Sequence, residues 1–294
     1  MMNIGLIGST AFYNTYKQEL IKDCDVIVFG KCSITDALNN TLPFESLLNE
    51  CQYLFFEEIN SASFQLVIAG LKNGKNIVID AASVSMEEMN EMHKISNEGN
   101  LKCMIFNSPD YYKLFEPLKD EIKNPFFVEM MLEYGDNKGC HLSDNISTTL
   151  YECMQHLLHI FKSDIKQINV KPLKIFSPKT DFISIQLDFS NGCSANIKMS
   201  EMATNSNHTI NIYQHSNVFR IDLSEKRTER VTTDTNGLKS ICINASEINI
   251  IEKKICHFFA VVNNTKTHTD SILDNYLALE LSSKIIKKIN SLYE

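Results

Sequence analysis

The sequence predicts an α/β protein with two domains, an N-terminal Rossmann-like domain with a doubly wound parallel sheet and a C-terminal α+β domain on an open, largely antiparallel sheet. Two observations support this. In the first 120 or so residues, short and almost continuously apolar runs alternate with helical patterns, which is typical of parallel strands covered on both faces. In the remaining residues, apolar and polar side chains alternate along longer runs, which is typical of an antiparallel sheet. We expect the boundary between residues 122 and 123, giving domains 1–122 and 123–294.

The elements of the first domain follow from its apolar runs. Five strands are expected, at residues 3–8, 25–30, 53–57, 76–80 and 101–106. Between the third and fourth strands, apolar residues from Phe64 to Leu71 recur at helical spacing, and Asn73-Gly74 is expected to end this helix. A later helix that ends at Gly99 carries a methionine stripe, Met86, Met89 and Met92, which we interpret as core packing.

The second domain is expected to begin with a strand at 126–135 and a helix at 148–161. The alternating runs that follow predict further strands, at residues 164–175, 181–192, 194–202, 209–215 and 217–223. Asn191-Gly192 is a strong hairpin signal between two of these strands, and a helix at 271–289 is expected to close the chain.

Composition excludes several classes of partner. The 294-residue chain has a net charge of −8, so a nucleic-acid partner is not expected. It contains no run of about 18 apolar residues, so no membrane span is expected either. The stretch MMNIGLIGST reads as a first strand and not as a signal peptide, and the nine scattered cysteines form no C-x-x-C pair. We therefore expect a cytoplasmic protein with reduced thiols.

The order of motifs in residues 53–92 resembles a known family. Strand, turn, helix, Gly74-Lys75, strand and turn follow one another as in the glucose–fructose oxidoreductase and inositol dehydrogenase (Gfo/Idh/MocA) family. Residues 182–200 are similar to the sheet hairpin of that family, and Asp274 with Ala278 to its closing helix. The resemblance covers essentially the whole chain. It implies NAD(P)-dependent hydride transfer on sugars, imines or related carbonyls, and a sheet domain that often mediates dimers.

The resemblance places a cofactor-binding turn at the end of the first strand, at Gly8, Ser9, Thr10 and Ala11. In the family, a G-x-G-x-x-G turn lets the backbone approach the pyrophosphate of the dinucleotide. Gly8 keeps the tight turn, whereas Thr10 and Tyr13 stand at the positions of the second and third glycines.

Three further cofactor positions depart from the family pattern. Lys31 stands where an acid usually binds the ribose; it would suit a 2′-phosphate and favour NADP, or it is a surface lysine. In the turn after the third strand Asn60 is kept, but Glu57 and Glu58 bring carboxylates that would repel a dinucleotide. Asp80 takes the place of the glutamate in Glu-Lys-Pro, and an alanine replaces the lysine that polarises the substrate oxygen.

The general acid implied by the resemblance is also missing. Its helix region contains Asn145, Ser147, Thr149 and Glu152, with no histidine at the matched position. The remaining candidate proton donors are Tyr111, with its neighbour Tyr112, then Glu152 and His156. Cys153, His156 and His159 lie at helical spacing, but they drift around the helix and no further ligands complete a shell, so no metal is expected.

Two hypotheses follow. In the first, the chain is a divergent oxidoreductase that uses NADP or NAD to reduce a small carbonyl or imine substrate without the standard lysine–histidine pair. In the second, it is a catalytically inactive family member that acts as a binding or scaffolding subunit for a partner enzyme. The first implies a small-molecule substrate, and either a homodimer or a heteromer with a partner enzyme is expected. Free amides at the first helix would favour the oxidoreductase, and side chains filling that position would favour the inactive subunit.

Overall fold

The chain forms two compact units, and each is discontinuous in sequence. The computed structural model describes residues 2–22, 26–34, 42–61, 63–106, 114–118, 120–135, 142–176, 180–235, 237–243, 249–263 and 271–292. The first unit comprises Met1–Asn107 and Asn249–Leu277, and the second comprises Ser108–Ile248 and Ala278–Glu294. A single boundary between residues 122 and 123 would assign Asn249–Leu277 to the second domain, whereas its contacts group it with the first.

The first unit contains a five-stranded parallel sheet in the order β2-β1-β3-β4-β5. Its strands are β1 (Met2–Ile7), β2 (Val26–Cys32), β3 (Tyr53–Asn60), β4 (Asn76–Ser83) and β5 (Cys103–Ile105). All five strands predicted for this part of the chain are confirmed. β1, β3, β4 and β5 each contain at least three consecutive buried residues, which follows from their apolar runs because helices cover both faces of the sheet. β2, at the edge of the sheet, instead leaves Ile27 and Phe29 exposed.

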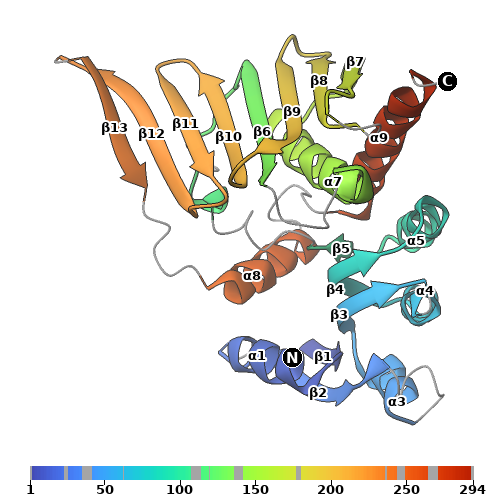
Figure 1. The fold of residues 1–294 in the computed structure, drawn as a ribbon. Helices are drawn as coiled ribbons and strands as arrows, with labels where there is room; N and C mark the ends of the chain where they lie inside the picture. Colours follow the sequence, from blue (N-terminus) through green and yellow to red (C-terminus); the bar gives the residue numbers. More distant parts are fainter. Residues whose placement is uncertain are drawn as a thin grey trace. The chain divides into compact units, whose positions relative to one another are not determined.

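Helices α1 (Thr10–Leu20) and α8 (Ile250–Val262) lie on one face of this sheet, and α3 (Leu42–Glu50), α4 (Phe64–Lys72) and α5 (Met86–Glu98) lie on the other (Figure 1). Aromatic side chains join α8 to the sheet: the Phe258 ring makes edge contacts with Tyr53 and Phe55, at centroid distances of 5.8 and 5.3 Å. The predicted ends of α4 and α5 are confirmed, since Gly74 has a φ of +71° and Gly99 follows α5 directly.

The second unit contains an eight-stranded sheet in the order β13-β12-β11-β10-β6-β9-β8-β7. Its strands are β6 (Phe127–Gly135), β7 (Ile165–Leu173), β8 (Phe182–Phe189), β9 (Ser194–Ala203), β10 (Asn207–Gln214), β11 (Asn217–Asp222), β12 (Arg227–Asp234) and β13 (Gly237–Ile243). The pair β6–β9 is parallel and the other pairs are antiparallel, so the sheet is mixed and largely antiparallel, as predicted. The expected hairpin joins β8 to β9, with Gly192 at a φ of +86°.

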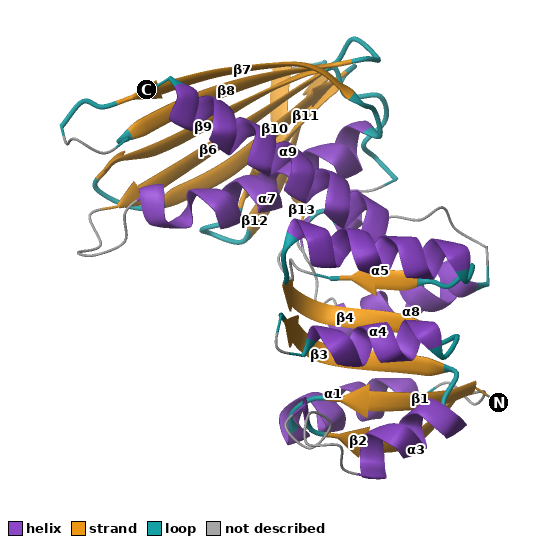
Figure 2. Ribbon diagram, turned by 90° about the vertical axis from the view of Figure 1, so that its right-hand side faces the viewer, coloured by secondary structure: helices purple, strands orange, loops and turns teal. Residues whose placement is uncertain are grey.

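Two helices cover one face of this sheet: α7 (Leu142–Phe161) and the part of α9 (Ile272–Ser291) that begins at Ala278 (Figure 2). The buried residues of β8, such as Ile185 and Leu187, alternate with more exposed ones, which is the pattern of a sheet packed on one side. None of the helices in the described ranges is both long and apolar enough to span a membrane.

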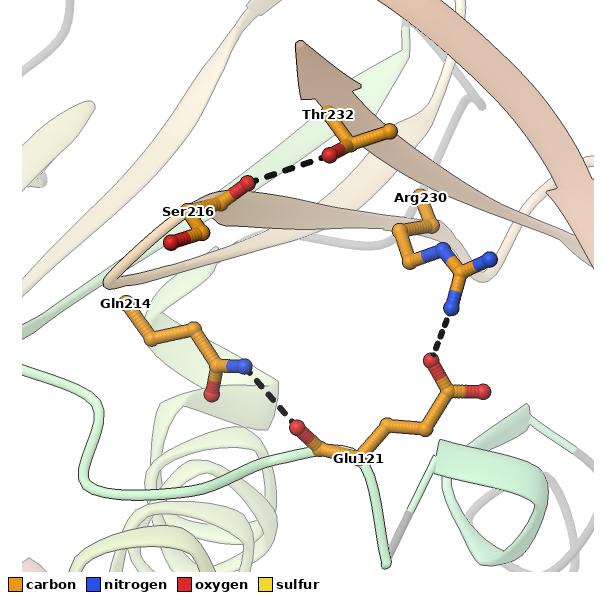
Figure 3. A network of polar contacts seen from close by, with 5 residues as sticks. All are labelled: Glu121, Gln214, Ser216, Arg230 and Thr232. Atoms are coloured by element: carbon orange, nitrogen blue, oxygen red, sulfur yellow. Dashed lines mark hydrogen bonds and ion pairs between the residues drawn. The ribbon is translucent and has the colours of Figure 1, made fainter. Parts of the chain in front are cut away.

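The segment that enters the second unit is tied to the sheet by the side-chain amide of Gln214 (Figure 3). Its Nε2 donates to the carbonyl of Glu121 at 2.8 Å, and its Oε1 accepts the backbone N–H of Lys123 at 2.7 Å. The carboxylate of Glu121 also accepts a hydrogen bond from Nη1 of Arg230 at 2.6 Å. These bonds fix where the chain reaches β6.

Candidate functional site

The turn between β1 and α1 brings the N-terminus of a helix to the carboxyl end of the parallel sheet. The backbone N–H of Gly8 donates to the carbonyl of Cys32 at 2.9 Å, which closes the turn against β2. Ser9 is the N-cap of α1, and its Oγ accepts the N–H of Phe12 at 3.1 Å. Unpaired N–H groups and the helix dipole make such an N-terminus a site for anions.

The anion at this N-terminus is the carboxylate of Glu57, from the neighbouring strand β3. The backbone N–H of Ser9 donates to Oε2 of Glu57 at 2.5 Å, and Oγ of Ser9 donates to Oε1 at 2.9 Å. Gly8 permits this approach, because a Cβ at this position would lie 2.6 Å from the Cβ of Glu57 and 2.7 Å from its Oε2. An internal carboxylate therefore occupies the position at which the resemblance implies a pyrophosphate.

The side chains that follow Ser9 also contact one another. Nζ of Lys31 donates to Oγ1 of Thr10 at 3.1 Å and lies 5.6 Å from the ring centroid of Tyr13. Lys17 lies over the same ring, at 5.3 Å. The structure thus brings together the predicted residues Gly8, Ser9 and Thr10 with Lys31.

With the side chains in these positions, the turn does not fit the pyrophosphate of a dinucleotide. The Ser9 amide is already paired, and the negative charge of Glu57 would face the negative charge of the phosphates. Ala11 is exposed in the first turn of α1, and its carbonyl accepts a hydrogen bond from the hydroxyl of Thr15. Asn60 serves the local turn before α4, where its Oδ1 accepts the N–H of Ser63 at 3.1 Å.

Asp80, on β4, lies in a polar cluster between the sheet and the helices α1 and α8. Its Oδ1 accepts hydrogen bonds from the hydroxyl of Tyr16 at 2.7 Å and from Nζ of Lys254 at 2.5 Å. Burial, together with the charge and hydrogen bond of Asp80, raises the pKa of Tyr16 far above its usual value. The side chain of Lys254 is 7% exposed, and its ammonium also lies 5.5 Å from the ring centroid of Phe106.

Sequence reasoning missed Lys254, although a signal was available. The lysine falls on the apolar stripe of α8 with Phe258 and Val261, at i, i+4 and i+7, and all three side chains are buried. A charged residue on a buried stripe is expected to have a partner of opposite charge. That partner is Asp80, which lies 174 positions away in the sequence.

The other predicted site residues belong to the second unit. Tyr111 and Tyr112 lie outside the described residues, whereas Glu152 and His156 both lie on α7 and line a cavity of about 300 Å³. The His156 ring is stacked on Phe115 at a centroid distance of 5.4 Å, and burial lowers its pKa to about 4. Within the described ranges, no three His, Cys, Asp or Glu side chains are grouped so that they would bind a metal ion.

The helix region at the start of α7 does not supply a general acid where the resemblance implies one. The helix begins at Leu142, six residues before the expected start at 148. Thr149 is buried there, and its Oγ1 is hydrogen-bonded to the hydroxyl of Tyr134 at 2.9 Å. Ser147 is exposed, and the side chain of Asn145 lies outside the described part.

Comparison with known proteins gives a structural likeness without a sequence match. No protein-family model matches the chain, and no curated protein does. Among solved structures, UDP-N-acetylglucosamine 3-dehydrogenase from Acidithiobacillus ferrooxidans is 12% identical with a TM-score of 0.71, over 97% of this chain and 96% of that one. A dehydrogenase (MviM) from Clostridium difficile is 16% identical with a TM-score of 0.72, over 98% and 99%. Levoglucosan dehydrogenase in complex with NADH is 13% identical with a TM-score of 0.69, over 97% and 96%.

At these identities the likeness establishes the fold. The chain has the two-unit fold of the Gfo/Idh/MocA-type dehydrogenases over nearly its whole length, as the resemblance predicted. Fold alone does not fix activity, which depends on the side chains at the sites described above.

Proposed function

We propose that this chain has the fold of the NAD(P)-dependent oxidoreductases but acts as a binding subunit without hydride transfer. The observation that carries the proposal is the pair of hydrogen bonds from Ser9 to the carboxylate of Glu57. It fills the anion position of α1 with a residue of the protein itself. As a subunit, the chain would associate with a second copy or with a partner enzyme.

The bonds between Ser9 and the Glu57 carboxylate are favoured in energy over a pyrophosphate bound at the same turn. A carboxylate at a helix N-terminus is stabilised by about 0.3–1 kcal/mol at an exposed site, and a bond to an ionised acceptor is roughly twice as strong as a neutral one. A pyrophosphate at the same amide would have to displace Glu57 or lie beside it. Two like unit charges about 4 Å apart repel by about 4 kcal/mol at an effective dielectric constant of about 20.

The positions implied for proton transfer support the same proposal. Ala81 offers no hydrogen bond to a substrate oxygen, and Asp80 already accepts bonds from Tyr16 and Lys254. The buried Thr149 hydroxyl is engaged by Tyr134. At these positions the Asp80 carboxylate and the Thr149 hydroxyl are bonded to side chains of the protein itself.

A second candidate is a divergent reductase that admits its cofactor when Glu57 turns away. One observation favours it: Ser9 already donates two hydrogen bonds to an anion, and a phosphate would use the same donors. Lys31, beside Thr10, would then suit the 2′-phosphate of NADP. The proton donors in this candidate are Tyr111, Glu152 and His156, and the substrate is a small carbonyl or imine.

Calorimetric titration with NADPH and then NADH separates the two candidates. Calorimetry is suitable because the chain has no Trp to report binding by quenching. We expect no heat from the wild type at millimolar nucleotide. Binding by the wild type with a Kd of about 1 μM, equivalent to about 8 kcal/mol, would overturn the proposal in favour of the reductase.

Two variants test whether the Glu57 carboxylate is the cause. Glu57→Ala removes the internal anion and is expected to gain weak nucleotide binding. Glu58→Ala is the matched control, because Glu58 is the next residue of β3 and its side chain is exposed. Equal heats of nucleotide binding from the two variants would show that the Glu57 carboxylate is not what prevents binding.

A further inference from the structure

Large apolar side chains are exposed at the junction of α1 and β2, and neither candidate function explains them. β2 is an edge strand of the first unit's sheet, and its Ile27 and Phe29 are 41% and 45% exposed. Ile21, the C-cap of α1, is 57% exposed. Single exposed apolar residues are ordinary, whereas a contiguous group marks an interaction surface.

Phe29 lies on the face of the sheet that α1 covers. The next residue, Gly30, faces the opposite side, because a Cβ there would lie 3.6 Å from Cδ2 of Leu47 on α3. Side chains alternate between the two faces along a strand, so Phe29 and Lys31 share the other face. That face belongs to α1, since Nζ of Lys31 donates to Oγ1 of Thr10 at 3.1 Å.

A stripe of α1 lies beside this row of β2. Tyr13, Lys17 and Ile21 follow one another at i, i+4 and i+8, which places them on one side of the helix. Lys31 lies 5.6 Å from the ring centroid of Tyr13, so the stripe and the row meet at that end. Because α1 leads into β2 and runs back against it, Ile21 and Ile27 fall at the other end. We call this group the β2–α1 surface: Tyr13, Lys17, Ile21, Ile27, Phe29 and Lys31.

The charged side chains of the β2–α1 surface are both cationic. Lys17 and Lys31 are exposed, and their ammonium groups lie 5.3 and 5.6 Å from the ring centroid of Tyr13. Neither forms an ion pair with a carboxylate among the described residues. Glu19, the acidic residue of α1, is paired with Lys22 at 2.6 Å. A negatively charged partner is therefore complementary to this surface.

A β-bulge disfavours the addition of a strand at this edge. Val28 pairs with Ile4 and Gly30 pairs with Gly5, so Phe29 is the extra residue of the bulge. Bulges and lysines on edge strands keep other strands from pairing with them. An amphipathic helix does not need the strand edge, because it binds through its apolar side chains.

A second copy of the chain and a membrane fit the β2–α1 surface less well. In a two-fold dimer this surface would face itself, so the lysines of the two copies would meet. Recognition of anionic lipids usually takes a cluster of about four to eight Lys or Arg residues, and this surface has Lys17 and Lys31. The net charge of −8 also opposes the approach of the chain to an anionic bilayer.

We propose that the β2–α1 surface docks an acidic amphipathic helix of a partner protein. The apolar stripe of that helix would lie on Ile21, Ile27 and Phe29, and its carboxylates would reach Lys17 and Lys31. The inference rests on the proposed function, since it names the surface through which a binding subunit would hold its partner. Docking is measured without nucleotide, so a failure to dock and a failure of the proposed function in the NADPH titration are distinguishable.

Fluorescence anisotropy with three labelled peptides tests the proposal on the wild type. The probe repeats the unit Leu-Glu-Glu-Leu-Leu-Glu-Glu, the second peptide has Lys in place of each Glu, and the third has Ser in place of each Leu. We expect the probe to bind about tenfold more tightly than either of the others, because only the probe matches both the charge and the apolar side chains. Its Kd should rise with salt, which screens exposed charges.

Two variants locate the binding. Phe29→Ala removes the central apolar side chain, and the double variant Lys17→Glu/Lys31→Glu reverses the charge; each is expected to weaken probe binding about tenfold. Phe176→Ala and Lys72→Glu make matching changes at exposed positions outside the surface and should bind like the wild type. Thermal unfolding of each variant checks that it is folded, and the comparison of peptides on the wild type does not depend on any variant.

Any of four results would overturn the proposal. The first is no change in anisotropy of the probe at about millimolar protein, or binding of another peptide as tight as that of the probe. The second is binding of the probe by folded Phe29→Ala and by the folded double variant at the level of their controls. The third is co-sedimentation of the wild type, but not of Phe29→Ala, with phosphatidylserine vesicles, which would indicate a membrane. The fourth is a wild-type dimer in light scattering that Phe29→Ala converts to a monomer, which would indicate a second copy.

Discussion

Nζ of Lys254 lies 2.5 Å from Oδ1 of Asp80, and the same oxygen accepts the hydroxyl of Tyr16. The three residues come from α8, β4 and α1, so one carboxylate joins two helices to the sheet that they cover. Tyr16 and Lys254 are buried, and the Asp80 side chain is 25% exposed. Because removing water from an ammonium is costly, Lys254 is tolerated here only with its partner in place.

Asp80→Asn is expected to destabilise the first unit by about 3 kcal/mol, the low end for breaking a buried ion pair, because it leaves Lys254 buried without a counter-charge. Lys254→Met removes the charge together with its desolvation cost and should be milder. Urea denaturation measures both. Lys253→Met, on the exposed side of α8, is the control and should leave the midpoint unchanged. A larger loss from Lys254→Met than from Asp80→Asn would contradict this account.

Gly8→Ala is expected to cost about 1–3 kcal/mol, the usual range for overpacking. Its added Cβ would lie within 3.0 Å of Glu57 and of Cδ1 of Phe12, so the carboxylate must move from the Ser9 amide. Thermal unfolding measures the loss. Gly30→Ala is the matched control on β2, since a Cβ there meets only Cδ2 of Leu47, at 3.6 Å. Equal shifts in Tm for the two variants would show that the residues around position 8 accommodate the added Cβ without a loss of stability.

The local features of the fold were predictable from sequence because each depends on neighbouring residues. The apolar run of β3 and the Asn191-Gly192 turn indicate their structures without reference to the rest of the chain. The start of α7 was missed because its first turns, from Leu142, are mostly polar, and only Leu142 and Ile146 are apolar among residues 142–147.

The candidate site was only partly predictable, because its contacts join residues that are distant in sequence. The sequence indicated a carboxylate at Glu57 near the turn, and we expected it to weaken dinucleotide binding. It did not indicate that this carboxylate bonds to Ser9, 48 positions away. The grouping of α8 with the first unit depends on tertiary packing of Phe258 on β3, which no periodicity reveals.

Gln214→Leu is expected to destabilise the second unit by about 2 kcal/mol, because it leaves the N–H of Lys123 and the carbonyl of Glu121 without their partner in a partly buried position. The ion pair of Arg230 with Glu121 remains, but its side chains are 34% and 39% exposed, so it contributes little. Urea denaturation measures the change. Gln186→Leu, at an exposed position of β8, is the control. A Gln214→Leu midpoint equal to that of the control would show that these bonds do not hold the entering segment.

His156→Gln is expected to reduce the loss in the free energy of unfolding as the pH falls. In the folded chain burial lowers the pKa of His156 to about 4, below the unfolded value of about 6.5, so the unfolded state binds the extra proton between these values. The stability from this residue is complete above about pH 6.5 and falls by about 3 kcal/mol as pH drops to about 4. Urea denaturation at a series of pH values measures the slope, and His215→Gln, at an exposed position, is the control. His208, whose pKa is also lowered by burial, is unchanged in both variants and contributes equally to their slopes. If the free energies of unfolding of the wild type and His156→Gln ran parallel with pH, His156 would bind its proton over the same pH range in the folded and the unfolded protein.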